Sequence, residues 1–279
     1  MRPIEDTVVL VTGATDGLGR AVARELFARG ARVLVHGRDR TKLYPAAREL
    51  SRGGVPAPAF LADLSSLEEV RDLAGYVQRT TPQLHVLINN AGIGSGLPEG
   101  RERQVSEDGY ELRLAVNHLA GFLLTMRLLP LLRRSAPSRI INVASLAQAP
   151  IDFDDPMLEH GYSGTRAYGQ SKLAQITTGF ELAERLDPKE VTVASLHPAT
   201  YMPTKMVLEE IGSSVDRLED GVAATVRLAL DPELEGVTGH FFDRYSVAAA
   251  HAQADDRAAR RRLWELSLEL TGEREPAFL

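Results

Sequence analysis

Short apolar runs alternate with longer amphipathic stretches along the whole chain, and this alternation constrains the fold more than any other feature. Continuous apolar strands separated by helices are typical of a parallel sheet that helices cover on both faces. The sequence therefore predicts an α/β protein with a doubly wound, seven-stranded parallel sheet. The expected strands are TVVLVT, RVLVH, PAFLADL, HVLINN, RIINVAS, VTVASLH and GHFFD, and the expected helices cover about 17–29, 41–52, 67–80, 111–134, 168–186 and 218–230.

Three irregular segments, at 92–106, 149–166 and 199–216, each follow the carboxyl end of a predicted strand. Ligands of open α/β sheets bind at that edge, so we expect these segments to form the walls of the site. No repeat, low-complexity tract or linker divides the 279 residues. The sequence therefore predicts one domain over 1–279.

Composition excludes several classes of site. The chain has no cysteine, which rules out disulfides, thiolate metal sites and a cysteine nucleophile. No His/Asp/Glu cluster has metal-ligand spacing, so no metal is expected. A net charge of −6 gives no general attraction to nucleic acid, and the basic run at 257–262 is expected to be a solvated helix face.

The chain is expected to be cytoplasmic and not bound to a membrane. Residues 1–7 are too short and too charged for a signal peptide. The most apolar stretch, at 119–132, is shorter than the roughly 18 residues of a membrane span and contains Arg127 and Pro130. This stretch predicts a buried helix.

A glycine-rich turn, TGATDGLG, joins the first strand to the first helix. Glycines at such a junction allow a tight turn and bring backbone N–H groups close to a pyrophosphate. The spacing G-x-x-x-G-x-G departs from the common G-x-G-x-x-G pattern, and helix–strand packing alone is the other interpretation. The predicted cofactor contacts here are Gly13, Thr15, Asp16, Gly17, Leu18 and Gly19.

The end of the second strand favours NADP(H) over NAD(H). An acidic side chain there binds the ribose 2′-hydroxyl, whereas arginine suits a 2′-phosphate, and the sequence VLVHGRDR places Arg38 at this point. Two observations oppose this interpretation. Arg38 could pair with Asp39 or cap a turn, and Asp16 adds a negative charge to the glycine-rich turn.

The stretch TRAYGQSK places Tyr168 and Lys172 four residues apart, on one face of a helix. An ammonium beside a phenol favours the phenolate. Such pairs also occur by chance on many helices, so only the other motifs can show whether this pair is catalytic or an ordinary helix face.

Six motifs in the same chain resemble the short-chain dehydrogenase/reductase family: TGATDGLG, ADLSS, NNAG, AVNHLAGF, INVAS and YGQSK. The segments NHLAGFLLT and IDFDDPMLEHGYSGTRAYGQSKLA are most similar to its retinol-dehydrogenase-like and WW-domain-oxidoreductase-like branch. The resemblance implies a Rossmann fold and an oxidoreductase. Membrane-bound members of that branch carry an N-terminal anchor, which we do not expect in this chain.

The resemblance also implies roles for individual residues. Tyr168 would be the general acid or base, and Ser145 would bind the substrate oxygen. Lys172 and a positive nicotinamide would lower the pKa of the phenol, and Asn117 would hold a water that relays protons. Further cofactor contacts would come from Asp63, Leu64, Asn90, Ala91, Gly92, Pro198 and Thr204, together with Tyr168 and Lys172, whereas Asn89 would be structural.

The chain departs from the family pattern in two places. Ala199 stands where the family usually has glycine, in a loop that also carries Tyr201 and Met202. An insertion at 149–166 lengthens the separation of Ser145 and Tyr168 and would form a lip over the site, with its acidic cluster (Asp152, Asp154 and Asp155) exposed to solvent.

The sequence thus predicts an NADP(H)-dependent alcohol dehydrogenase or carbonyl reductase that acts on a partly apolar small molecule. A homodimer or homotetramer is expected through the helices at 111–134 and 168–186, which are apolar on more than one face. One alternative is a dinucleotide sensor without turnover, which would not need all four catalytic residues. Another is a nucleotide-sugar epimerase or dehydratase, for which the part beyond Thr204 is small. The expected pocket residues are Leu97, Leu146, Pro150, Tyr201, Met202 and Met206.

Overall fold

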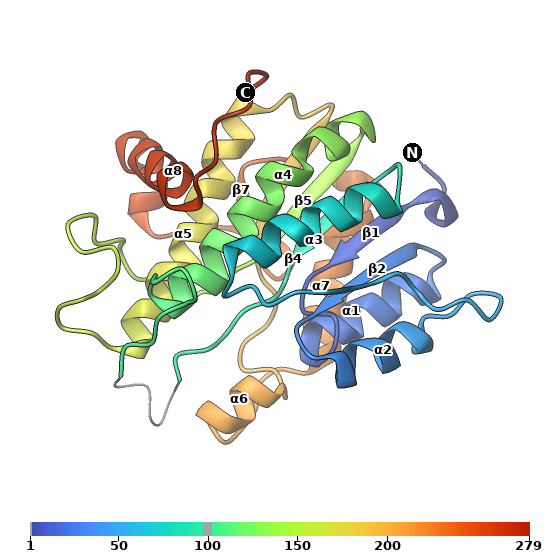
Figure 1. The fold of residues 1–279 in the computed structure, drawn as a ribbon, viewed down its shortest axis with the longest axis horizontal. Helices are drawn as coiled ribbons and strands as arrows, with labels where there is room; N and C mark the ends of the chain where they lie inside the picture. Colours follow the sequence, from blue (N-terminus) through green and yellow to red (C-terminus); the bar gives the residue numbers. More distant parts are fainter. Residues whose placement is uncertain (1, 97–101) are drawn as a thin grey trace.

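One sheet of eight strands, in the order β3-β2-β1-β4-β5-β6-β7-β8, forms the centre of the protein. Figure 1 shows its strands between the surrounding helices. The computed structural model describes residues 2–96 and 102–279. The seven expected strands pair in parallel, and a short edge strand that was not expected, β8, pairs antiparallel with β7. The strands are β1 (Val8–Val11), β2 (Arg32–Gly37), β3 (Ala59–Leu61), β4 (Val86–Asn89), β5 (Ser138–Val143), β6 (Val191–His197), β7 (His240–Asp243) and β8 (Ser246–Ala248).

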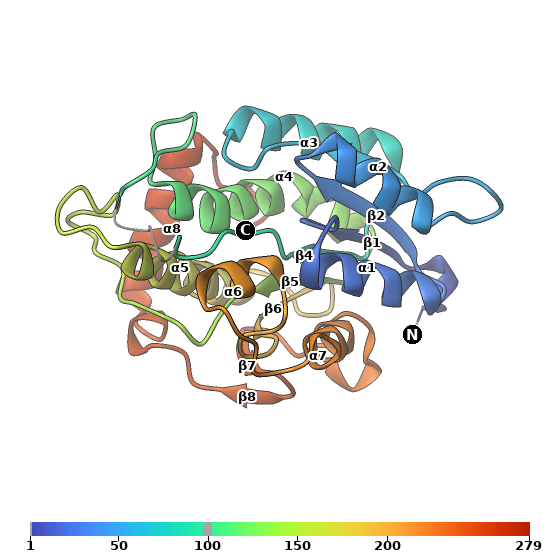
Figure 2. The ribbon, with the colours of Figure 1, turned by 90° about the horizontal axis from the view of Figure 1, so that it is seen from below.

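Helices cover both faces of the sheet, as the sequence predicts. Helices α3, α4 and α5 pack on one face, and α1, α2 and α7 pack on the other. Figure 2 shows α3 and α4 on the opposite side of the strands from α1 and α7. The α-helices are α1 (Gly17–Ala28), α2 (Arg40–Glu49), α3 (Leu67–Thr80), α4 (Ala120–Arg134), α5 (Gly164–Arg185), α6 (Lys205–Glu210), α7 (Leu218–Leu230) and α8 (Arg257–Thr271). Three short 3₁₀ turns lie at Ile4–Asp6, Pro232–Leu234 and Ala252–Ala254.

Short polar side chains fix where several helices begin. Ser66 accepts a hydrogen bond from the third backbone N–H of α3, and Ser163 does the same for α5. Such caps satisfy N–H groups that have no partner inside the helix. Because the cap is Ser163, α5 begins four residues before Tyr168, and all of TRAYGQSK lies within the helix.

The helix expected at 111–134 is not a single α-helix. It begins with a π-helical segment, η2 (Leu114–Leu119), and continues as α4. π-Helical turns insert a residue into the helix and often mark functional sites. Here the wider turn contains Asn117, whose side chain bonds to the backbone of Ile93.

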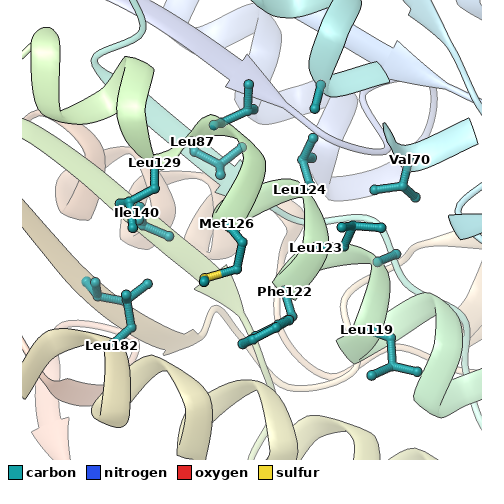
Figure 3. Close-up of a cluster of buried hydrophobic side chains, with 14 of the residues drawn as sticks. Val70, Leu87, Leu119, Phe122, Leu123, Leu124, Met126, Leu129, Ile140 and Leu182 are labelled. Carbon is teal, nitrogen blue, oxygen red and sulfur yellow. The ribbon is translucent and has the colours of Figure 1, made fainter. Parts of the chain in front are cut away.

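The segment from η2 through α4 is long and apolar enough to cross a membrane, contrary to the length argument made from sequence. It spans 21 residues with a mean hydropathy of 1.4 in its most apolar window, but 83% of that window is buried inside the protein. Figure 3 shows Phe122, Leu124 and Leu129 of α4 among side chains of neighbouring elements, such as Leu182 of α5. The apolar character of this segment is accounted for by packing in the core.

Helix α8 covers the outer side of α4 and α5. The buried Trp264 of α8 makes an edge-to-face contact with Phe122 of α4, with ring centroids 5.1 Å apart. Arg260 is only 7% exposed and pairs with Glu181 and Glu184 of α5. The basic run at 257–262 is therefore not a uniformly solvated face. Part of the apolar faces that were expected to meet a second subunit thus packs against the C-terminal helix of the same chain.

Candidate active site

The irregular segments lie at the carboxyl edge of the sheet, where the sequence placed them. Segment 92–106 follows β4, 149–166 follows β5 and runs into the start of α5, and 199–216 follows β6 and contains α6. Strand order reverses between β1 and β4, and this is the point where doubly wound sheets bind their ligands. The described parts of the three segments therefore surround the expected position of a ligand.

The glycine-rich turn has the backbone shape of a dinucleotide cradle. Gly13 and Gly17 have φ values of 65° and 49°, in the left-handed region that favours glycine. A Cβ on Gly19 would overlap the carbonyl of Gly13 and the side-chain amide of Asn90. Glycine at 19 thus allows α1 to begin close to the end of β4. The first N–H groups of α1 then lie where the strand order reverses, a position that suits a pyrophosphate.

Three cationic residues follow β2, and two of them, Arg38 and Lys42, lie near carboxylates. Arg38 is exposed and lies 4.0 Å from Asp63, whereas Asp39, its expected alternative partner, caps α2 through Thr41. Lys42, which sequence reasoning missed, lies 3.3 Å from Asp16. This pairing offsets the negative charge of Asp16, and a bond from the Gly17 N–H lowers the pKa of the same carboxylate.

Asn117 fixes the backbone that follows β4. Its side-chain oxygen accepts a bond from Ile93 N at 2.8 Å, and its amide nitrogen donates to Ile93 O at 3.1 Å and to Ser171 Oγ at 2.9 Å. A Cβ on Gly92 would lie 3.1 Å from the Asn117 oxygen and 3.4 Å from Lys172 Nζ. Glycine at 92 thus lets the backbone pass close to both side chains.

Tyr168, Lys172 and Ser145 lie together at the edge of the sheet. Lys172 is 5% exposed, and its ammonium lies 5.7 Å from the centre of the Tyr168 ring. That ammonium donates to Val143 O at 2.9 Å and to Gln175 Oε1 at 3.1 Å. Ser145 Oγ accepts a bond from Ala147 N at 3.0 Å. The fold thus brings together a phenol and a buried cation from α5 and a hydroxyl from the loop after β5.

Burial sets the protonation of this group. It raises the pKa of Tyr168, and a hydrogen bond with Ser145 opposes that rise, while the charges of Glu210 and Tyr201 add to it. Burial also lowers the pKa of Lys172 to about 8. The pKa of Tyr168 was expected to fall, but the protein atoms alone raise it, because desolvation of the phenolate outweighs the other effects.

A platform segment, residues 93–96, connects the site to buried charges that the sequence did not reveal. Arg113, 4% exposed, donates to Gly94 O at 2.9 Å and Ser95 O at 3.0 Å. It also bonds to the hydroxyl of Tyr162 at 2.7 Å and lies 3.5 Å from Glu111, which is 1% exposed. Burial beside Glu111 raises the pKa of Tyr162 to about 12, so this phenol is neutral.

The expected pocket residues divide into three groups. Leu146, Pro150 and Tyr201 are exposed in the loops after β5 and β6, and Met206 is half-buried on α6. Met202 was wrongly assigned to the pocket: it is 8% exposed and packs in the core between α1 and α7. Leu97 lies outside the described residues.

Other expected contacts lie at the same edge. Leu64 and Pro198 are buried, and Asp63 accepts a bond from Ser65 N at 2.9 Å. Thr12 Oγ1 accepts bonds from Asn90 N and Ala91 N at 2.9 and 3.0 Å, so the glycine-rich turn is tied to the end of β4. Two further positions, Thr15 and Leu18, belong to that turn, and Thr204 caps α6 beside Gly17.

The acidic cluster of the lip organises the loop itself. Asp152 pairs with Arg166 at 2.7 Å, and Asp155 accepts bonds from the backbone of Glu159 and His160. Asp154 alone is almost fully exposed. Within residues 2–96 and 102–279, no group of three His, Asp or Glu side chains has metal-binding geometry.

Comparison with known proteins matches residues 7–212 to the family described as short chain dehydrogenase. Retinol dehydrogenase 14 of Homo sapiens is 37% identical over 293 residues, which cover 95% of this chain and 86% of that protein. An uncharacterised protein from Mycobacterium paratuberculosis has a TM-score of 0.79 and 29% identity, and the match covers 97% of this chain and 95% of that one. The NADP active-site complex of Pseudomonas aeruginosa RhlG has a TM-score of 0.70 and 28% identity, covering 87% and 97%.

Proposed function

This chain belongs to the short-chain dehydrogenase/reductase family and is an oxidoreductase related to retinol dehydrogenases. We propose that it interconverts a carbonyl and an alcohol with NADP(H), and that Tyr168 is the general acid and base. The observation that carries the proposal is the convergence of Tyr168, Ser145 and Lys172 at the sheet edge that also carries the glycine-rich turn.

Each of these side chains has a distinct task in the proposed reaction. A nicotinamide, when bound, supplies or accepts the hydride at the carbon that bears the oxygen. The Tyr168 hydroxyl donates a proton to the carbonyl oxygen during reduction and takes it back during oxidation. Ser145 orients the same oxygen through a hydrogen bond. Lys172 holds a positive charge near the phenol, which favours the phenolate as it forms.

Asn117 acts in this proposal by fixing backbone. Its side chain bonds to both the N–H and the carbonyl of Ile93, which leaves the residues after β4 with one conformation. Because Gly92 lies close to Asn117 and Lys172, this bonding also fixes the backbone beside the catalytic lysine.

NADP(H) is the proposed cofactor because of the charges beyond β2. Arg38 and Lys42 both lie at this edge, and the carboxylates near them are paired or form caps. A guanidinium with free N–H groups suits a 2′-phosphate. The NADP complex of the similar RhlG structure agrees with this choice.

The proposed substrate is a partly apolar aldehyde, ketone or alcohol. Large apolar side chains are exposed around the mouth of the site: Leu146, Tyr201, Leu208 and Ile211 are each between 42% and 48% exposed. Exposed apolar patches of this kind mark ligand or partner sites. The name of the human relative, a retinol dehydrogenase, points to the same class of molecule.

The test is oxidation of NADPH and of NADH with retinal and a series of linear aldehydes, for the wild type, Tyr168→Phe and the control Tyr76→Phe. Tyr76 is 54% exposed on α3, away from the site. We expect NADPH-preferring turnover that falls at least about 100-fold in Tyr168→Phe, the usual size of a general acid–base contribution. Unchanged NADPH binding by calorimetry would show that the variant is folded. Full activity of Tyr168→Phe would refute the assigned role, and absence of cofactor binding in the wild type would refute the function.

A further inference from the structure

We propose that Glu210 is a positioning residue that fastens α6 across the catalytic side chains by binding the platform segment, so that substrate is held at Tyr168. The inference rests on the proposed function of the site and assigns a task to a carboxylate that the proposed reaction does not otherwise use.

The Glu210 carboxylate is the main polar attachment of α6 to the platform segment. Its two oxygens accept bonds from Ser95 N at 3.1 Å, Ser95 Oγ at 2.7 Å and Gly96 N at 2.7 Å. None of the residues of α6 is buried, so apolar packing holds this short helix weakly. Hydrogen bonds to an ionised carboxylate are the stronger kind, and three of them on one side chain form an anchor.

Arg113 binds the carbonyl side of the peptide groups whose N–H groups bind Glu210. It binds the carbonyls of Gly94 and Ser95, which fixes the orientation of the peptide groups of the platform segment. The N–H groups of Ser95 and Gly96 are then held toward Glu210. The positive charge of Arg113 at the carbonyl oxygens also polarises these peptide groups, which strengthens the bonds that their N–H groups donate to Glu210.

Glycine at 94 is explained by this contact. A Cβ on Gly94 would overlap the Glu210 carboxylate, whereas the φ of Gly94 is not in the left-handed region. The backbone would accept alanine, and only the close approach of Glu210 requires glycine there. The obstacle to a Cβ is the end of a flexible side chain, so Gly94→Ala should displace the carboxylate without unfolding the protein.

The anchor lies close to the reacting group. The charge of Glu210 raises the pKa of Tyr168, as does Tyr201 from the same segment, which places both within electrostatic reach of the phenol. With α6 fastened, residues 201–210 form a wall of the site. With α6 released, that wall moves away from Tyr168.

Four variants test the proposal: Glu210→Ala, Gly94→Ala, the double variant and the control Glu209→Ala. Glu209 is the neighbour of Glu210 on α6, is 64% exposed and lies 3.5 Å from Lys205. Two readouts are needed. Hydrogen–deuterium exchange of peptides covering α6 reports the attachment without requiring any activity. KM and kcat with NADPH and retinal, or the best linear aldehyde, report its effect on the reaction.

We expect Glu210→Ala and Gly94→Ala each to speed exchange of α6 about tenfold or more, because bonds to a charged group are lost. KM should rise by a similar factor while kcat changes less. The double variant should match Glu210→Ala, since the added methyl group then meets no carboxylate. Glu209→Ala should behave as the wild type.

Equal exchange in Glu210→Ala and the wild type would overturn the attachment, as would additive effects of the two substitutions. Faster exchange with an unchanged KM would overturn the positioning role. A wild type without turnover would refute the proposed function instead, and the exchange comparison would still decide whether Glu210 fastens α6.

Discussion

Replacing Arg113 with methionine should be among the most destabilising substitutions in the site. Methionine keeps the unbranched chain but removes every N–H group of a side chain that is 4% exposed. Glu111, 1% exposed, then loses its cation and keeps bonds from Leu114 N at 2.7 Å and Tyr162 at 3.3 Å. The carbonyls of Gly94 and Ser95 lose their donor as well.

The size of the loss follows from these partners. Removing one member of a buried ion pair costs about 3–5 kcal/mol, because the other charge stays buried without compensation. Glu111 still accepts bonds from two donors, so the loss of stability should lie near the lower end of this range. The carbonyls of the platform segment that lose their donor increase the loss. We expect Arg113→Met to lower the free energy of unfolding by about 3–4 kcal/mol, which corresponds to a fall in Tm of roughly 6–10 °C.

Urea titration and calorimetry of Arg113→Met and of a matched control, Arg29→Met, measure the difference. Arg29 pairs with Glu25 at 2.7 Å, but both side chains are exposed, so its replacement should cost less than about 1 kcal/mol. The double variant Glu111→Gln/Arg113→Met should lose less than the sum of the single changes. A loss below about 1 kcal/mol in Arg113→Met would refute the reasoning that this pair is buried and mutually dependent.

Three further outcomes are expected. Burial lowers the pKa of His118 to about 3, so below about pH 6.5 the unfolded chain binds a proton that the folded chain does not, and the free energy of unfolding falls. Between about pH 7 and pH 5, urea titrations should show that the free energy of unfolding falls by about 2 kcal/mol less in His118→Leu than in the wild type. Because α8 covers the outer faces of α4 and α5, sedimentation should find a single 30.5 kDa chain, and a stable dimer would contradict this. Replacing Arg38 with leucine should weaken NADPH binding about tenfold or more in calorimetry and leave NADH binding nearly unchanged, and an equal loss for both cofactors would contradict a contact to the 2′-phosphate.

Local patterns predicted most of the fold. The bounds of α3 and α7 agree with the sequence, because an apolar stripe specifies each of them and Ser66 also marks the start of α3. Strand β8 has three residues, two of them exposed, so it carries no apolar run that could reveal it. The π-helical turn at Asn117 was also hidden, because bonds to Ile93 accompany it and that residue lies far away in the sequence.

The candidate site was predicted where its residues belong to short motifs, and missed where distant partners create it. Glu210 and Ser95 are 115 positions apart, and only the fold brings them into contact. Nothing in the residue types of Arg113 or Glu210 distinguishes them from surface charges. The wrong assignment of Met202 has a related cause, because a large apolar side chain in a site loop suits a pocket and a core equally well.

The charges around Tyr168 also bear on the proton transfers of the proposed reaction. The residue types alone permit both reduction and oxidation, but the structure adds that burial, Glu210 and Tyr201 all raise the pKa of this phenol. Lys172, with its pKa lowered to about 8, is still largely cationic near neutral pH, yet its ammonium is engaged by Val143 O and Gln175. Under the proposed mechanism the resting site therefore holds a protonated phenol. That phenol is ready to give a proton to a carbonyl oxygen, whereas oxidation of an alcohol must first remove the proton. The charges around the phenol thus affect the rate of each proton transfer, whereas the cellular supply of NADPH sets the net direction.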